Sequence, residues 1–188
     1  MTRNPNTETA GEATTAALLD AALDQMALVI AGTRPDQLVL ATPCTDWDVR
    51  ALLRHIVGGP HVFAAMIRGE RVDPSAPQPD RLGDGDPAAA FGDARRALET
   101  ALRQHPERAA HLGPIVAVET AIHASDLARA TGQAGRLDPA IAEEALTLVR
   151  VRLTPVARAG STAFGPEVPV PAGAPAYDRL AGFLGRRP

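Results

Sequence analysis

Lysine is absent from the 188-residue sequence, and all 19 of its basic residues are arginine. Without lysine, the chain can form no Schiff base with a carbonyl substrate and no phosphate-binding loop that depends on a lysine. Cysteine occurs once, at Cys44, which excludes an intrachain disulfide and a thiolate metal cluster. This cysteine usage makes a reducing cytoplasm the expected location.

Aromatic residues and net charge are also scarce. Aromatics make up 3% of the chain, and the formal net charge is −3 at pH 7. These values favour neither a stacking platform for single-stranded bases nor a basic surface for phosphates, so we expect no nucleic-acid partner. No apolar run reaches the roughly 18 residues of a membrane span, and the first residues lack the apolar region of a signal peptide. We expect a small-molecule ligand and no membrane partner, with monomer and homodimer both open.

Apolar residues at helical spacing follow a polar stretch over residues 1–12, which we expect to be a disordered tail. Residues 13–188 then form one domain. Their pattern predicts an all-α bundle with additional short helices and an extended proline-rich segment near the C-terminus. Pro60 is expected to kink or break the second helix. Capping residues and prolines place the later helix starts at Thr45 and Asp46, Asp86-Pro87, Gly113-Pro114, Asp138-Pro139 and Pro175.

The segment 114–131 combines ionisable and large aliphatic side chains on one helical face. At about 100° per residue, Asp126, Glu119 and His123 lie at roughly 20°, 40° and 80° from Ile115. Charged groups inside a bundle must be paired, hydrogen-bonded or bound to a metal. Glu119 and His123 are one helical turn apart, so one cation could contact both. A plain hydrogen bond between them, or a pair with Arg129, explains the spacing without any metal and is favoured over a metal site from spacing alone.

Two further residues have a structural and a chemical interpretation. His55 falls at the border of an apolar stripe, where a half-exposed structural histidine is more common than a ligand. Cys44 precedes a helix, and a thiol near a helix N-terminus can become a nucleophile. Packing of Cys44 against Trp47 as a small buried residue is favoured over that role.

Three motifs carry a resemblance to a known family: Thr42-Pro-Cys-Thr-Asp-Trp-Asp-Val49, Leu52-Leu-Arg-His55-Ile-Val-Gly-Gly59 and His123-Ala-Ser-Asp126-Leu-Ala-Arg-Ala-Thr-Gly132. Together they resemble the actinobacterial branch of the DinB-like superfamily, in its short single-domain members. This branch is the metal-binding domain type of mycothiol-dependent maleylpyruvate isomerase, and the resemblance extends from about residue 15 to the end. It implies a four-helix bundle that binds a divalent metal, zinc first of all, through His55, Glu119 and His123.

The resemblance also implies an activity, that of a mycothiol-dependent S-transferase or isomerase acting on a small electrophile. Asp126 would orient a metal ligand, although an ion pair with Arg129 on the helix surface explains its spacing equally well. Without lysine, an anionic thiol cosubstrate would be held by arginine, and Arg50, Arg54 and Arg129 are the nearest in sequence to the ligands. Two alternatives stay open. The chain could be a non-catalytic module that binds a metal or small ligand, or a metal-free enzyme with Glu119 and His123 as an acid–base pair.

Two departures from the family bear on the substrate. The family usually has His-Gly-Trp-Asp, and this chain has Ser125 at the position of the tryptophan. The isomerase also carries an additional C-terminal domain, for which 188 residues leave no room. Maleylpyruvate isomerisation itself is therefore not the expected reaction.

Overall fold

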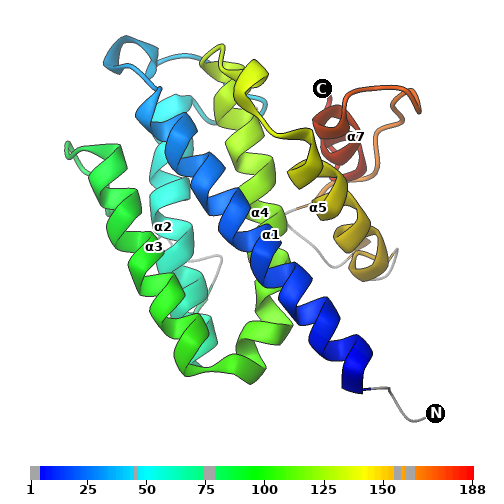
Figure 1. The fold of residues 1–188 in the computed structure, drawn as a ribbon. Helices are drawn as coiled ribbons and strands as arrows, with labels where there is room; N and C mark the ends of the chain where they lie inside the picture. The colour runs from blue at the N-terminus through cyan, green and yellow to red at the C-terminus, as the bar shows by residue number, and fades with distance from the viewer. Residues whose placement is uncertain (1–4, 45, 74–78, 155–157, 160–163) are drawn as a thin grey trace.

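The computed structural model describes residues 5–44, 46–73, 79–154, 158–159 and 164–188. Over these residues the chain is all-α and contains no strand, which confirms the predicted fold class (Figure 1). Four long helices form the bundle: α1 (Pro5–Ala31), α2 (Val49–Arg68), α3 (Pro87–Gln104) and α4 (Pro106–Ala130).

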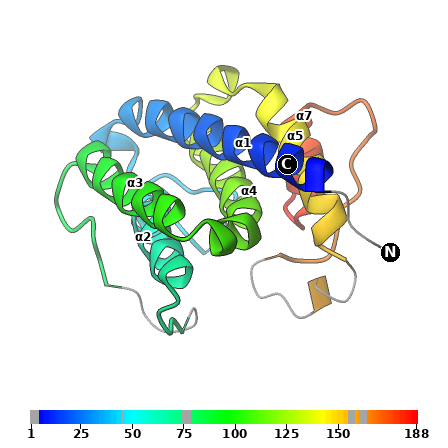
Figure 2. The same cartoon turned by 60° about the horizontal axis from the view of Figure 1, so that its bottom comes forward.

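Two further helices pack beside the bundle. Helix α5 (Pro139–Arg152) contacts α4, and α7 (Ala176–Phe183) contacts both α5 and α4. Figure 2 shows α5 and α7 on the opposite side of α4 from α2 and α3. Helix α4 therefore has neighbours on several sides. Two short 3-10 turns complete the described elements, η1 (Pro35–Gln37) and η2 (Ala134–Arg136).

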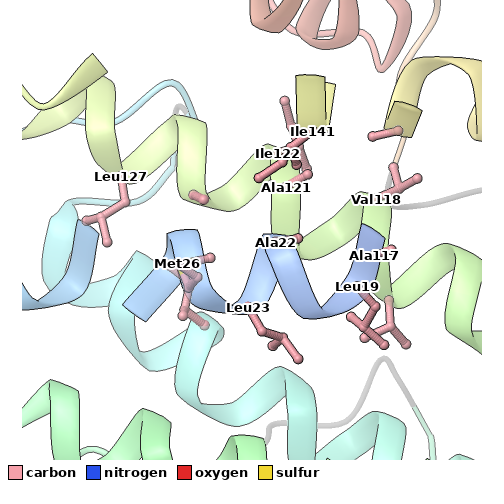
Figure 3. Close-up of a cluster of buried hydrophobic side chains, with 14 of the residues drawn as sticks. Leu19, Ala22, Leu23, Met26, Ala117, Val118, Ala121, Ile122, Leu127 and Ile141 are labelled. Atoms are coloured by element: carbon pink, nitrogen blue, oxygen red, sulfur yellow. The ribbon is translucent and has the colours of Figure 1, made fainter. Parts of the chain in front are cut away.

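Small residues let α1 and α4 pack closely at the centre of the core (Figure 3). Ala22 of α1 and Ala117 and Ala121 of α4 are all fully buried. The stretch Ala13–Ala31 of α1 is long and apolar enough to cross a membrane. One face of that stretch, with Leu23 and Met26, is buried in the bundle, as expected for the core helix of a globular domain.

Two predicted helix starts are wrong. Helix α2 begins after Asp48, whose side chain accepts a hydrogen bond from the Ala51 amide; Thr45 lies outside the described residues. The reason is that Ala41 pairs with Asp48 in a β-bridge, and the Val49 and Arg50 amides donate to the Leu40 and Leu38 carbonyls, which keeps Asp48 in an extended conformation. Helix α4 begins at Pro106, not at Gly113-Pro114. Pro106 takes the first helical position, where no N–H is needed, and Pro114 is tolerated inside the helix.

The other boundary signals agree better with the structure. Asp86 and Asp138 cap α3 and α5, with a proline following each of them, and α7 begins directly after Pro175. A break of the helix at Pro60 is wrong, because Pro60 lies within α2 and the helix continues through it to Arg68. Helix α1 begins at Pro5, so its backbone is helical over part of the stretch predicted to be a tail.

Candidate metal centre

A pocket of about 740 Å³ lies where several parts of the chain meet. The loop before α2, helices α2 and α4, and the segment that follows α7 each contribute to its walls. Its lining combines titratable groups with Trp47 and Leu184. The titratable and charged residues that line it are Cys44, Asp46, His55, Glu119, His123, Arg186 and Arg187.

His55, Glu119 and His123 come together in this pocket. Each offers a ligand atom, and these atoms all lie within 4.8 Å of one another. His123 Nε2 is 3.0 Å from Glu119 Oε2, one turn earlier on α4. The His55 ring on α2 meets the His123 ring edge-on, with 4.7 Å between their centroids. Two imidazoles and one carboxylate are a donor set that suits a divalent metal, zinc in particular.

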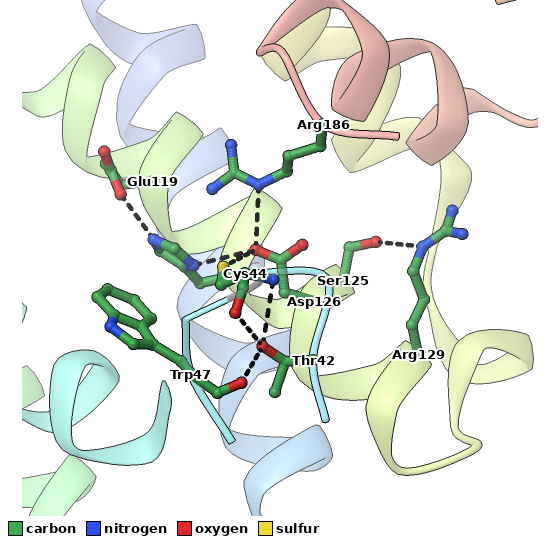
Figure 4. Close-up of polar contacts among 9 residues, drawn as sticks. Thr42, Cys44, Trp47, Glu119, Ser125, Asp126, Arg129 and Arg186 are labelled. Atoms are coloured by element: carbon green, nitrogen blue, oxygen red, sulfur yellow. Dashed lines mark hydrogen bonds and ion pairs between the residues drawn. The ribbon is translucent and has the colours of Figure 1, made fainter. Parts of the chain in front are cut away.

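Asp126 lies on the other side of the His123 ring (Figure 4). Its Oδ2 is 3.1 Å from His123 Nδ1, and the residue is only 2% exposed. Metal-binding histidines typically donate their second ring nitrogen to such a carboxylate, which fixes the tautomer and the ring orientation. The contact is therefore the one expected of a residue that orients His123. Asp126 does not pair with Arg129, the other possibility that the spacing allowed, because Arg129 bonds Asp178 on α7.

Burial and hydrogen bonding set the charge of these groups. The His55 ring faces the open pocket but lies between Trp47 and His123. Burial, followed by the charge of His123, lowers the pKa of His55 to about 4, so it is neutral at pH 7. Burial alone would lower the pKa of His123, but its bonds to Asp126, Cys44 and Glu119 hold it well above the usual value.

For the two carboxylates, burial acts to raise the pKa, and the interactions with His123 act to lower it. Burial alone would raise the pKa of Glu119, and the hydrogen bond and charge of His123 lower it overall. Burial also works to raise the pKa of Asp126, which His123 and then Arg186 bring below its usual value. Both carboxylates are therefore ionised at neutral pH, and protonated His123 donates from Nε2 to Glu119 and from Nδ1 to Asp126. A metal at Nε2 would take the place of the Nε2 proton between His123 and Glu119.

Cys44 is not the simple packing residue that its sequence context favoured. It is half-buried, lines the pocket, and its Sγ donates to Asp126 Oδ2 at 3.3 Å. The loop is held in place by Thr42, whose hydroxyl donates to the Trp47 carbonyl at 2.8 Å and accepts from the Cys44 amide at 3.1 Å. In this loop Trp47 also lies against His55, with 4.7 Å between the ring centroids.

Cys44, His123 and Asp126 form a second group whose ligand atoms lie within 4.8 Å of one another. The position facing Asp126 is already taken by a positive charge, because Arg186 Nε donates to its Oδ2 at 3.3 Å. His123 Nδ1 also points to Asp126 and not to open space. The group with His55 and Glu119 is therefore the better candidate for a cation.

The structure does not bring the three predicted cofactor-binding arginines to the pocket. Arg50 and Arg54 pair with Asp84 and Asp80 beyond α2, at 3.8 and 3.0 Å. Arg129 is held by Asp178, and also contacts the buried Ser125. Ser125 is absent from the described pocket lining, so the position at which the family has tryptophan faces elsewhere. Arg186 and Arg187 occupy the pocket instead.

Comparisons with known proteins agree with this picture. The family described as "Mycothiol maleylpyruvate isomerase N-terminal domain" matches residues 19–128, a span that contains His55, Glu119, His123 and Asp126. Two proteins of Mycobacterium tuberculosis, "Uncharacterized protein Rv0738" of strain H37Rv and "Uncharacterized protein MT0763" of strain CDC 1551, are each 34% identical over 174 residues. These alignments cover 88% of this chain and 93% of each relative. No solved structure matches the chain.

Proposed function

The chain belongs to the mycothiol maleylpyruvate isomerase N-terminal domain family, and we propose that it is a zinc-dependent enzyme of the mycothiol-dependent transferase or isomerase type. Its substrate would be a small electrophile. The observation that carries this proposal is the convergence of His55, Glu119 and His123 in a pocket that is open to solvent. Three protein ligands leave further coordination positions for a reactant, as in catalytic zinc sites.

The chemistry that bound zinc supplies is a positive charge, which favours the thiolate form of a thiol and polarises an electrophile. The chain's own residues would hold the metal and orient its ligands. His55 arrives neutral, and Asp126 keeps a proton on His123 Nδ1, so Nε2 of His123 is left for ligation. The chain has no lysine, and its one thiol, Cys44, is hydrogen-bonded to Asp126. The attacking sulfur is therefore supplied by the cosubstrate, for which mycothiol is proposed.

A second candidate function is supported by one contact. The 3.0 Å approach of His123 to Glu119 is also what a metal-free acid–base pair would show. A module that binds a metal without turnover is a third candidate, but the open pocket favours catalysis over a closed structural site.

Turnover with a fluorogenic electrophile separates these functions. Purified protein is incubated with mycothiol and monochlorobimane, and formation of the fluorescent thioether is followed. We expect the protein to accelerate the reaction, a chelator to abolish the acceleration, and added zinc to restore it. Chelator-insensitive turnover would favour the acid–base pair, and zinc binding without turnover of any electrophile tried would favour the binding module.

Asp126→Asn tests whether this carboxylate orients His123. The amide keeps the shape of the side chain but removes the charge that accepts from His123 Nδ1 and Arg186 Nε. We expect zinc affinity, measured by competition with a chromophoric chelator, to fall about 10- to 100-fold. The matched control is Asp178→Asn, which also removes a carboxylate paired with an arginine but lies outside the pocket lining. Equal affinities for the two variants would contradict the role of Asp126.

A further inference from the structure

The segment after α7 closes one side of the pocket and brings the guanidinium of Arg186 to it. Leu184, Gly185, Arg186 and Arg187 all line the pocket. The Arg186 side chain is 14% exposed, and its Nε is bound to Asp126. Among the described residues no hydrogen bond or ion pair involves its two terminal nitrogens. Figure 4 shows these nitrogens extending past Asp126 on the side of Glu119.

We propose that Arg186 is a ligand-recognition residue that binds a carboxylate group of the small molecule in the pocket. A guanidinium presents its donors in a rigid planar fork that matches the two oxygens of a carboxylate. Asp126 already fixes Nε, so little side-chain entropy is lost when the terminal nitrogens bind. The inference rests on the proposed function, because it names the class of ligand that this same pocket takes.

The charges around Arg186 favour a single negative charge. Asp46, Glu119 and Asp126 bring three carboxylates to the pocket and its wall, and Arg186 and Arg187 bring two guanidiniums. With His123 protonated these charges balance, and a divalent cation on His55, Glu119 and His123 that displaces the Nε2 proton would leave a small positive excess. One added carboxylate balances that excess, whereas a doubly charged phosphoryl group would exceed it and meet the neighbouring carboxylates.

The single tryptophan makes the test direct, because Trp47 lines the same pocket and its fluorescence can report binding. Zinc-loaded full-length protein is titrated with propionate, with its neutral analogue propionamide, and with methylphosphonate. In Arg186→Gln we expect propionate to bind about tenfold or more weakly than in the parent, and propionamide to bind unchanged. The matched control Arg50→Gln removes the same charge outside the pocket and should leave propionate affinity unchanged.

Three results would overturn the inference: an unchanged propionate affinity in Arg186→Gln, an equal loss of propionamide, or an Arg186-dependent preference for methylphosphonate. If Arg186→Gln does not fold, Arg186→Lys keeps the positive charge without the planar fork of the guanidinium. Its propionate affinity should still fall several-fold, and an unchanged affinity overturns the inference.

Titration of chelator-treated protein separates this inference from the proposed zinc-dependent function. Arg186-dependent propionate binding there would stand even if the chain bound no zinc, and zinc binding without Arg186 dependence would leave only the metal proposal.

Discussion

Replacement of His123 by alanine is expected to abolish stoichiometric zinc binding. His123 contributes Nε2 beside Glu119, and its other ring nitrogen, Nδ1, is hydrogen-bonded to Asp126. Loss of a residue that only supports a ligand costs about 10- to 100-fold in metal affinity, so loss of the ligand itself should cost more than about 100-fold. His55→Ala should have a similar effect. Metal content after zinc loading and desalting, measured by mass spectrometry, checks both variants.

The same two helices provide matched controls. His61→Ala removes a half-buried histidine from α2, and His111→Ala removes an exposed one from α4. Neither residue is part of the described pocket lining, and both variants should keep one zinc ion per chain. Thermal unfolding of all four variants shows whether the fold is retained. Full zinc occupancy in folded His55→Ala and His123→Ala would exclude these histidines as ligands.

Gly185→Ala is expected to destabilise the chain by about 2–5 kcal/mol and to displace the segment that carries Arg186. Gly185 has a φ of +87°, which costs an L-residue about 1–2 kcal/mol. A Cβ atom there would also lie 2.7 Å from the backbone of Gly165, which leaves no flexible side chain to move aside. Such overpacking typically adds about 1–3 kcal/mol. Chemical denaturation gives the change in the free energy of unfolding.

Gly132→Ala separates the cost of a positive φ from the cost of the close contact between residue 185 and Gly165. Gly132 also has a positive φ, +73°, but a Cβ atom there would meet nothing within 4 Å. This variant should therefore lose only the conformational part, about 1–2 kcal/mol. Equal losses in Gly132→Ala and Gly185→Ala would show that the contact with Gly165 contributes nothing. In that event the wall formed by the C-terminal segment is looser than the structure indicates.

The local part of the site could be predicted from the sequence. Glu119, His123 and Asp126 lie on one helix, where a period of 3.6 residues fixes which side chains share a face. The same periodicity explains why Arg54 was a poor candidate for cofactor binding. Adjacent helical residues diverge by about 100°, so Arg54 points away from the pocket that its neighbour His55 enters. Nearness in sequence on a helix therefore does not indicate a shared site.

The long-range part of the site could not be predicted in this way. Arg186 reaches Asp126 only because α7 packs on α5 and α4, a contact that no local pattern encodes. Cys44 reaches the same carboxylate from a loop whose shape depends on Thr42 and on docking to α2. The exposure of Ile115 also depends on packing that the helical periodicity does not encode. The wheel placed it among the core aliphatics, but it is 41% exposed, at the rim of a separate apolar pocket beside α5.

The central claim is that His55, Glu119 and His123 hold the metal, and zinc-edge X-ray absorption tests it most directly. The sample is zinc-loaded protein prepared without any added thiol, so that Cys44 supplies the one thiol of the chain and the one sulfur among the described residues that line the pocket. We predict only nitrogen and oxygen neighbours, at about 2.0–2.2 Å, with the scattering pattern of two imidazoles. A sulfur neighbour at about 2.3 Å would contradict the account, because it would place the metal on Cys44, His123 and Asp126.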